Sequence, residues 1–100
     1  MAGWNLNDIA WDRFKAQAVD PALLALVKAS ALVEGNADDY RRYLSNVFAD
    51  DQEFCAAVDS WAEDECRHGA ALGAWAKLAD PNFDPDLALT RFRDLYRIPV

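Results

Sequence analysis

The amino-acid sequence predicts an all-α fold, and three observations support that prediction. The 100 residues are rich in Ala, Leu and Asp and include only 4 Gly and 4 Pro, a composition that suits helices better than strands. Apolar residues recur at steps of three and four over long stretches. Asp stands directly before several of these stretches, where it can cap a helix. A chain of this length is typical of one small domain, so residues 1–100 are expected to form a single helical domain.

Two helices are expected in the first half of the chain. A short one is predicted at about residues 7–19, where apolar side chains repeat at helical spacing. Asp20 followed by Pro21 is typical of a helix start, because Asp caps and Pro fits the first helical position. From there the spacing continues to about Ala49. It passes Gly35, a weak point and a common helix stop, so we expect one long helix that is weakest at this glycine.

Two further helices are expected in the second half. Asp50 and Asp51 are a candidate cap pair for a long helix that ends at about Ala79, before an Asp-Pro pair. Asp84 is the candidate cap of a shorter helix over about 85–96. Residues 97–100 are expected to be extended, because a residue that precedes proline disfavours the helical region.

The charge balance and the cysteines exclude several classes of protein. There are 10 Lys and Arg residues against 17 Asp and Glu residues, a formal net charge of −7. Such a chain is a poor match for nucleic-acid phosphates or an anionic membrane surface. Cys55 and Cys66 lie on one expected helix, roughly 16 Å apart along its axis, so no disulfide between them is expected. Free thiols and the absence of a signal-peptide pattern predict a cytoplasmic protein with no nucleic-acid and no membrane partner.

The third expected helix has a stripe of side chains at alternating steps of four and three, which is typical of a buried bundle face. Two members of the stripe, Glu65 and His68, are polar and form a Glu-x-x-His pair. Buried carboxylates need partners, and one metal ion would satisfy both groups. The alternative is that the two side chains hydrogen-bond each other and their neighbours. The stripe consists of Phe54, Val58, Trp61, Glu65, His68, Leu72, Trp75 and Ala79.

The second expected helix places another carboxylate at the same depth. Its stripe has the same steps and includes Glu34. Glu34 lies 16 residues before Asp50, whereas Glu65 and His68 lie 15 and 18 residues after it. An antiparallel hairpin about Asp50 therefore brings the three side chains together. One Glu from one helix and Glu-x-x-His from the next form half of a two-metal ligand set, which favours metal binding over a purely structural cluster.

The residues around this pair resemble a known family. Residues 61–72, which read WAEDECRHGAAL, resemble the ligand helix of soluble acyl-carrier-protein desaturases, members of the ferritin-like di-iron carboxylate superfamily. Glu34 followed by Tyr40 resembles their preceding ligand helix, and residues 91–100 resemble a segment of related bacterial ferritin-like proteins. The resemblance implies a ferritin-like antiparallel hairpin that binds iron or, alternatively, manganese. It implies that Glu34 is a terminal ligand, Glu65 a bridging ligand and His68 an iron ligand.

The chain departs from that family because it has no second Glu-x-x-His motif and no second hairpin. A four-helix di-iron site therefore needs either a second copy of the chain, as a homodimer or higher oligomer, or a missing C-terminal half. Residues 68–84 are similar to encapsulated ferritins, whose short two-helix subunits place iron at a dimer interface. The sequence thus predicts half of a four-helix bundle.

Three functions are compatible with these features. The first is an oxygen-activating oxidoreductase of the desaturase or oxygenase type, with a small-molecule or acyl substrate. The second is a ferroxidase or iron-storage protein. The third is a non-catalytic dimerisation module in which Glu34, Glu65 and His68 form a buried polar cluster. The sequence identifies no catalytic residue, and Glu34, Glu65 and His68 are candidates for metal ligands only.

Overall fold

The computed structural model describes residues 3–98, and in that range the chain forms helices and loops without a strand. The all-α prediction is therefore confirmed. Three single turns of 3₁₀ helix come first, namely η1 (Leu6–Asp8), η2 (Trp11–Arg13) and η3 (Ala16–Ala18). The α-helices that follow are α1 (Pro21–Gly35), α2 (Ala37–Val47), α3 (Gln52–Ala79) and α4 (Pro85–Leu95).

The aspartates before α1, α3 and α4 cap these helices as the sequence predicts. Asp20 accepts a hydrogen bond from the Ala22 N–H at 2.7 Å, and Asp51 accepts one from the Phe54 N–H at 2.9 Å. The Asp84 carboxylate accepts from two backbone N–H groups of the first turn of α4, both at 3.1 Å. Each carboxylate satisfies backbone donors that a helix start leaves free, so local sequence sets these three helix starts.

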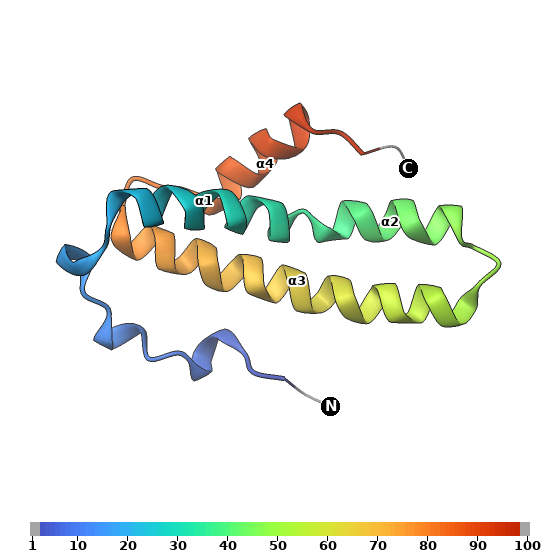
Figure 1. The fold of residues 1–100 in the computed structure, drawn as a ribbon, viewed down its shortest axis with the longest axis horizontal. Coiled ribbons are helices and arrows are strands. Elements are labelled where there is room, and N and C mark those ends of the chain that lie inside the picture. Colours follow the sequence, from blue (N-terminus) through green and yellow to red (C-terminus); the bar gives the residue numbers. More distant parts are fainter. Residues whose placement is uncertain (1–2, 99–100) are drawn as a thin grey trace.

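Figure 1 shows that α2 continues in the direction of α1 and that α3 returns alongside both helices. α4 crosses α1 at an angle near the junction between α1 and α2, and the N-terminal segment runs along the other side of α3. The three helical turns of that segment are joined by extended residues. Within the described part of the chain, no helix is both long enough and apolar enough to span a membrane.

The prediction of a single helix over 7–19 is wrong. Backbone angles in the extended region at Ile9, Phe14 and Val19 interrupt the segment after each 3₁₀ turn. A helix of this length is marginal in water without a packing partner. The extended steps instead let the segment follow α3, where the Phe14 ring meets the Trp75 ring edge-on with their centroids 5.7 Å apart. The packing of this segment against α3 therefore decides its backbone conformation, although its apolar residues have helical spacing.

The prediction of one continuous helix from Pro21 to about Ala49 is also wrong, although the break lies next to the predicted weak point. α1 ends at Gly35 and α2 begins at Ala37. Asn36 lies between the two helices, with φ −86° and ψ 7°, and it is only 1% exposed. The helix is interrupted at Asn36, whose buried side chain accepts a hydrogen bond from Arg93 of α4.

Helices α1 and α3 approach each other most closely at two glycines. A Cβ atom placed on Gly69 would lie 2.6 Å from the Gly35 nitrogen and 3.1 Å from the Ala31 carbonyl oxygen. Only glycine at position 69 permits this backbone contact. The residues of α3 buried along the line of contact are small or medium-sized: Val58, Ala62, Gly69, Gly73 and Ala76.

The buried face of α3 therefore matches the stripe predicted from the sequence only at Val58. Phe54 and Trp61 of that stripe are 38% and 43% exposed. Glu65 and His68 are half-buried at the edge of the contact. The large side chains are excluded from the α1–α3 contact because the two backbones leave no room for them. They lie instead on an adjoining face of the hairpin.

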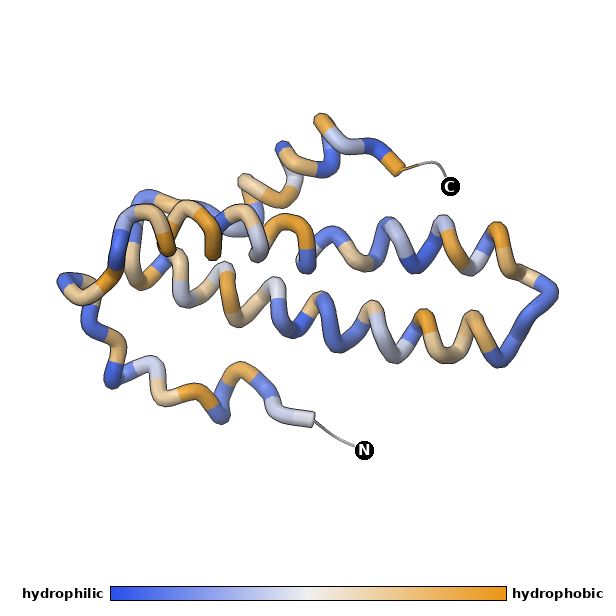
Figure 2. The backbone as a smooth tube through the Cα atoms, in the orientation of Figure 1, coloured by the Kyte–Doolittle hydropathy of each residue, from blue (hydrophilic) through white to orange (hydrophobic). Residues whose placement is uncertain are grey.

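The chain forms a flat molecule with little enclosed core. Its principal extents are 50 × 34 × 18 Å, and a helix with its side chains is about 10 Å thick. In Figure 2 hydrophobic residues are spread along the helices and alternate with hydrophilic ones. Among residues 3–98 the buried apolar side chains are Ala31, Ala37, Val58, Ala62 and Ala76.

We predict that Gly69→Ala destabilises the protein, because its methyl group would collide with the backbone of α1 and force the helices apart. Overpacking of this kind costs about 1–3 kcal/mol, measurable as a lower midpoint in urea unfolding. Gly35→Ala is the matched control, since a Cβ there would meet only the Leu89 side chain at 3.5 Å. Equal destabilisation by both variants would contradict the proposed role of the close approach.

Candidate metal centre

The structure brings Glu34, Glu65 and His68 together on one face of the hairpin. One ligand atom from each residue lies within 4.8 Å of the other two, and all three residues are half-buried. Glu34 is in the last turn of α1, whereas the other two lie in the middle of α3. The three residues that the sequence analysis placed at one depth therefore lie together in space.

The glycine contact explains this convergence. Glu34 directly precedes Gly35, and His68 directly precedes Gly69. Since these glycines form the closest approach of the two backbones, side chains next to them start from nearby positions. Glu65 lies three residues before His68, on the same side of α3.

The histidine and its neighbouring carboxylate are close without a hydrogen bond. His68 Nδ1 lies 3.6 Å from Glu65 Oε1, which is longer than a hydrogen bond in a protein. Their side chains are 41% and 25% exposed. Both groups are therefore partly exposed and are not hydrogen-bonded to each other.

The donor set matches a transition-metal ion. At metal–ligand distances of about 2.1 Å, opposite ligand atoms on one ion are roughly 4.2 Å apart. The candidate donors, within 4.8 Å of one another, are close to that separation. Two carboxylates and one imidazole suit iron, manganese or zinc, and three protein ligands leave coordination positions open.

A groove adjoins the two carboxylates. Its volume is about 240 Å³, and its wall is mostly apolar. Tyr40 and Trp61 form part of this wall and are 46% and 43% exposed. The lining residues are Val33, Glu34, Ala37, Tyr40, Trp61 and Glu65. The cluster therefore opens onto an apolar surface.

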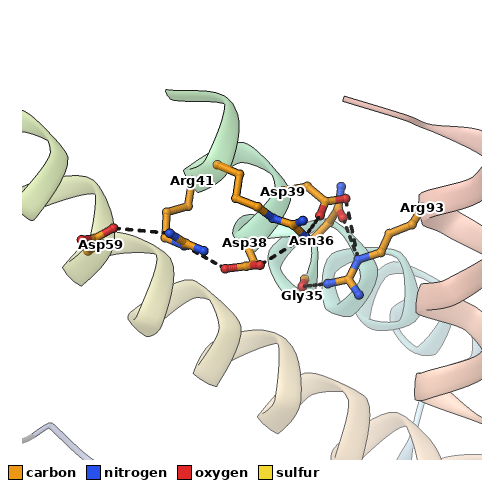
Figure 3. Close-up of polar contacts among 8 residues, drawn as sticks. Gly35, Asn36, Asp38, Asp39, Arg41, Asp59 and Arg93 are labelled. Atoms are coloured by element: carbon orange, nitrogen blue, oxygen red, sulfur yellow. Dashed lines mark hydrogen bonds and ion pairs between the residues drawn. The ribbon is translucent and has the colours of Figure 1, made fainter. Parts of the chain in front are cut away.

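The end of α1 that bears Glu34 is held by α4. Arg93 Nε donates to the Asn36 side-chain oxygen at 3.2 Å, and its Nη2 donates to the Gly35 carbonyl at 3.4 Å (Figure 3). Arg93 also lies 3.8 Å from Asp39. One guanidinium group thus satisfies the buried Asn36 and fixes the junction next to Glu34.

Ion pairs extend from this junction along α2. Arg41 donates to Asp38 at 2.8 Å and reaches Asp59 of α3 at 3.7 Å, as Figure 3 also shows. The hydrogen bond from Arg41 holds the pKa of Asp38 below its ordinary value, against an opposing effect of burial. These contacts join α2 to α3 beyond the glycine crossing.

Other acidic and thiol groups of α3 lie away from the cluster. Glu63 is exposed, and Asp64 pairs with Arg67 at 3.1 Å, as expected for an acid outside the stripe. Cys66 lines a separate groove beside α4, and both cysteines are free thiols. None of these groups joins the candidate ligands.

Three residues near the site were not predicted from the sequence, namely Trp4, Asn36 and Arg93. Trp4 stacks on the His68 ring, with the ring centroids 6.0 Å apart and the planes 7° from parallel. Arg93 and Asn36 are 57 residues apart in the chain, and Trp4 and His68 are even further apart. The spacing of residues along one helix therefore gives no signal for these contacts.

The fold and the site define an all-α protein with a cluster of two carboxylates and one imidazole on an open helix face. Comparisons with protein-family models, with curated proteins and with solved structures found no match. The interpretation of the site therefore depends on its own geometry.

We predict that Arg93→Ala destabilises the fold and weakens metal binding at Glu34. The change removes the Arg93 donor from the buried Asn36 side-chain oxygen, at a cost of about 1–3 kcal/mol. Thermal unfolding and titration with Mn(II) measure the two effects. Arg91→Ala is the control, because Arg91 lies on the same helix and is exposed. An unchanged melting temperature in Arg93→Ala would contradict the role of this contact.

Proposed function

We propose that this chain is a ferritin-like protein that binds iron through Glu34, Glu65 and His68, as one half of a di-iron site. The observation that supports the proposal is the convergence of these ligand atoms within 4.8 Å. A Glu from one helix and a Glu-x-x-His pair from the next are half of the ligand set of di-iron carboxylate bundles. Manganese is the alternative metal, because it accepts the same donors.

The second half of the site comes, in this proposal, from a second copy of the chain. A helical domain normally needs two packed layers to enclose a core, whereas residues 3–98 of this chain bury few apolar side chains, none larger than valine. Large apolar side chains are exposed on α1, α2 and α3: Leu23, Leu26, Val33, Tyr40, Phe54 and Trp61. A patch of this kind is typical of an interface.

A two-fold axis through the ligand face would match the chemistry. In a two-fold dimer the same patch contacts itself, so one half-site would face its copy. The two copies would provide four carboxylates and two imidazoles, which is the full di-iron set. The groove beside Glu34 and Glu65 would then lie between the copies, with Tyr40 and Trp61 in its wall.

The reaction we propose is oxygen-dependent oxidation of a small-molecule or acyl substrate. Bound iron would activate dioxygen, whose reduction would take two electrons from the substrate and two from an external reductant. Glu34, Glu65 and His68 hold the ligand geometry, and the apolar wall of the groove favours a hydrocarbon group beside the ligands. Enclosure of the groove by the partner would exclude water from that group.

Two other functions each have an observation in their favour. A ferroxidase needs free access for Fe(II), and the 41% exposure of the His68 side chain together with the net charge of −7 is compatible with this. A non-catalytic dimerisation module needs only the exposed apolar face. In that case the dimer forms without metal and does not require His68.

We predict that the wild-type protein, loaded anaerobically with Fe(II), contains about one iron per chain. Glu65→Ala and His68→Ala should each weaken metal binding at least about tenfold, because each removes one of only three donors. Elemental analysis and titration with Fe(II) give these values. Glu63→Ala is the matched control, since Glu63 lies on the same helix and is exposed.

Two outcomes would contradict the metal proposal. The first is a wild-type protein that stays free of metal after Fe(II) loading. The second is an equal loss of iron in Glu63→Ala and Glu65→Ala, which would indicate unspecific binding to acidic groups. Consumption of dioxygen with no organic product, and with accumulation of Fe(III), would favour the ferroxidase.

We predict further that the iron-loaded protein has twice the 11.2 kDa mass of the chain and that Leu23→Glu dissociates it. Leu23 lies about three helical turns before Glu34, so the new charge would enter the interface without reaching the ligands. Sedimentation analysis should show dimerisation at least about tenfold weaker.

Leu95→Glu is the matched control for this variant, because Leu95 is an equally apolar, 77% exposed residue on α4. A wild-type monomer after iron loading would exclude the second copy and favour a further segment of chain as the occupant. A stable dimer that persists in metal-free protein and in His68→Ala would favour the dimerisation module.

A further inference from the structure

A tryptophan from the N-terminal segment covers one face of the candidate histidine ligand. The rings of Trp4 and His68 are 7° from parallel, with centroids 6.0 Å apart, as in an offset stack. All of α1, all of α2 and the first half of α3 lie between the two residues in the chain, and Figure 1 shows the N-terminal segment alongside α3. The contact is therefore a feature of the tertiary structure.

Trp4 is itself held by charged residues of α3. The Arg67 guanidinium carbon lies 5.9 Å from the centroid of the Trp4 ring, a cation–π contact. Arg67 donates to Asp64 at 3.1 Å, which fixes the guanidinium group in turn. Asp64, Arg67, Trp4 and His68 thus form a continuous series of contacts that ends at the metal-ligand candidate.

The stack replaces the hydrogen bond that usually orients a ligand histidine. Such a histidine normally donates its second ring N–H to a carboxylate or carbonyl group, which fixes the ring. In the described part of the chain His68 makes no hydrogen bond, and its approach to Glu65 is 3.6 Å. The aromatic contact of the His68 ring is with Trp4.

We propose that Trp4 is a positioning residue that holds the His68 imidazole in the orientation required for metal binding. This inference depends on the proposed function, because it assigns a role toward the same site. The rest of the N-terminal segment supports the role: Trp11 Nε1 donates to the Leu6 carbonyl at 3.0 Å, and the Phe14 ring meets Trp75. The Trp11 hydrogen bond fixes the local shape of the segment, and the Phe14–Trp75 contact keeps it along α3.

The first test is made without metal. His68 is the only histidine, so its ring protons give one assignable set of NMR signals. Nuclear Overhauser contacts between Trp4 and His68, and ring-current shifts of the His68 protons, are expected in the wild type. Both are lost in Trp4→Ala, whereas Trp4→Phe retains a stacked ring. His68 signals that do not move in Trp4→Ala would overturn the inference.

The second test measures metal affinity. Trp4→Ala should bind Fe(II) or Mn(II) about tenfold more weakly than the wild type, the lower end of the loss seen when the support of a ligand is removed. Trp4→Phe should restore most of the affinity. Equal affinities for the wild type and Trp4→Ala would overturn the positioning role while leaving the metal site in place.

A control variant separates this role from general attachment of the segment. Phe14→Ala removes the contact with Trp75 but leaves Trp4 and its partners. It should retain the Trp4–His68 contact and lose less than about threefold in metal affinity. If Phe14→Ala weakens binding as much as Trp4→Ala, the effect is structural and the inference is wrong. A wild type that binds no metal instead overturns the proposed function itself.

Discussion

The backbone contact between α1 and α3 at Gly35 and Gly69 is the constraint on which the rest of this structure depends. A Cβ atom on Gly69 would lie 2.6 Å from the Gly35 nitrogen, so no larger residue fits there. The contact brings Glu34 and His68 to neighbouring positions, because each precedes one of the two glycines. It also excludes large side chains from the contact line and leaves Phe54 and Trp61 on the open face.

The candidate ligands are held from both sides of the hairpin by segments distant in sequence. Arg93 of α4 fixes the junction after Glu34 through Asn36 and the Gly35 carbonyl group. On the other side, Trp4 stacks on His68 and is itself in contact with Arg67. The flanking segments therefore support the ligand geometry as well as the fold.

The exposed face and the incomplete ligand set lead to the same proposal. A flat molecule, 18 Å thick, with exposed Leu, Val and aromatic side chains gains stability when a partner covers it. A cluster of three donors gains the rest of its ligands from the same partner. In our proposal metal binding and dimerisation therefore stabilise each other.

The sequence by itself determined the helix class, the caps at Asp20, Asp51 and Asp84, and the grouping of Glu34, Glu65 and His68. These features depend on neighbouring residues or on helical spacing within a hairpin. Only the tertiary structure decided the break at Asn36, the 3₁₀ turns of the N-terminal segment and the half-exposed position of the ligands. Each of these depends on contacts between residues far apart in the chain, such as Arg93 with Asn36 and Phe14 with Trp75, whose energies local patterns do not contain.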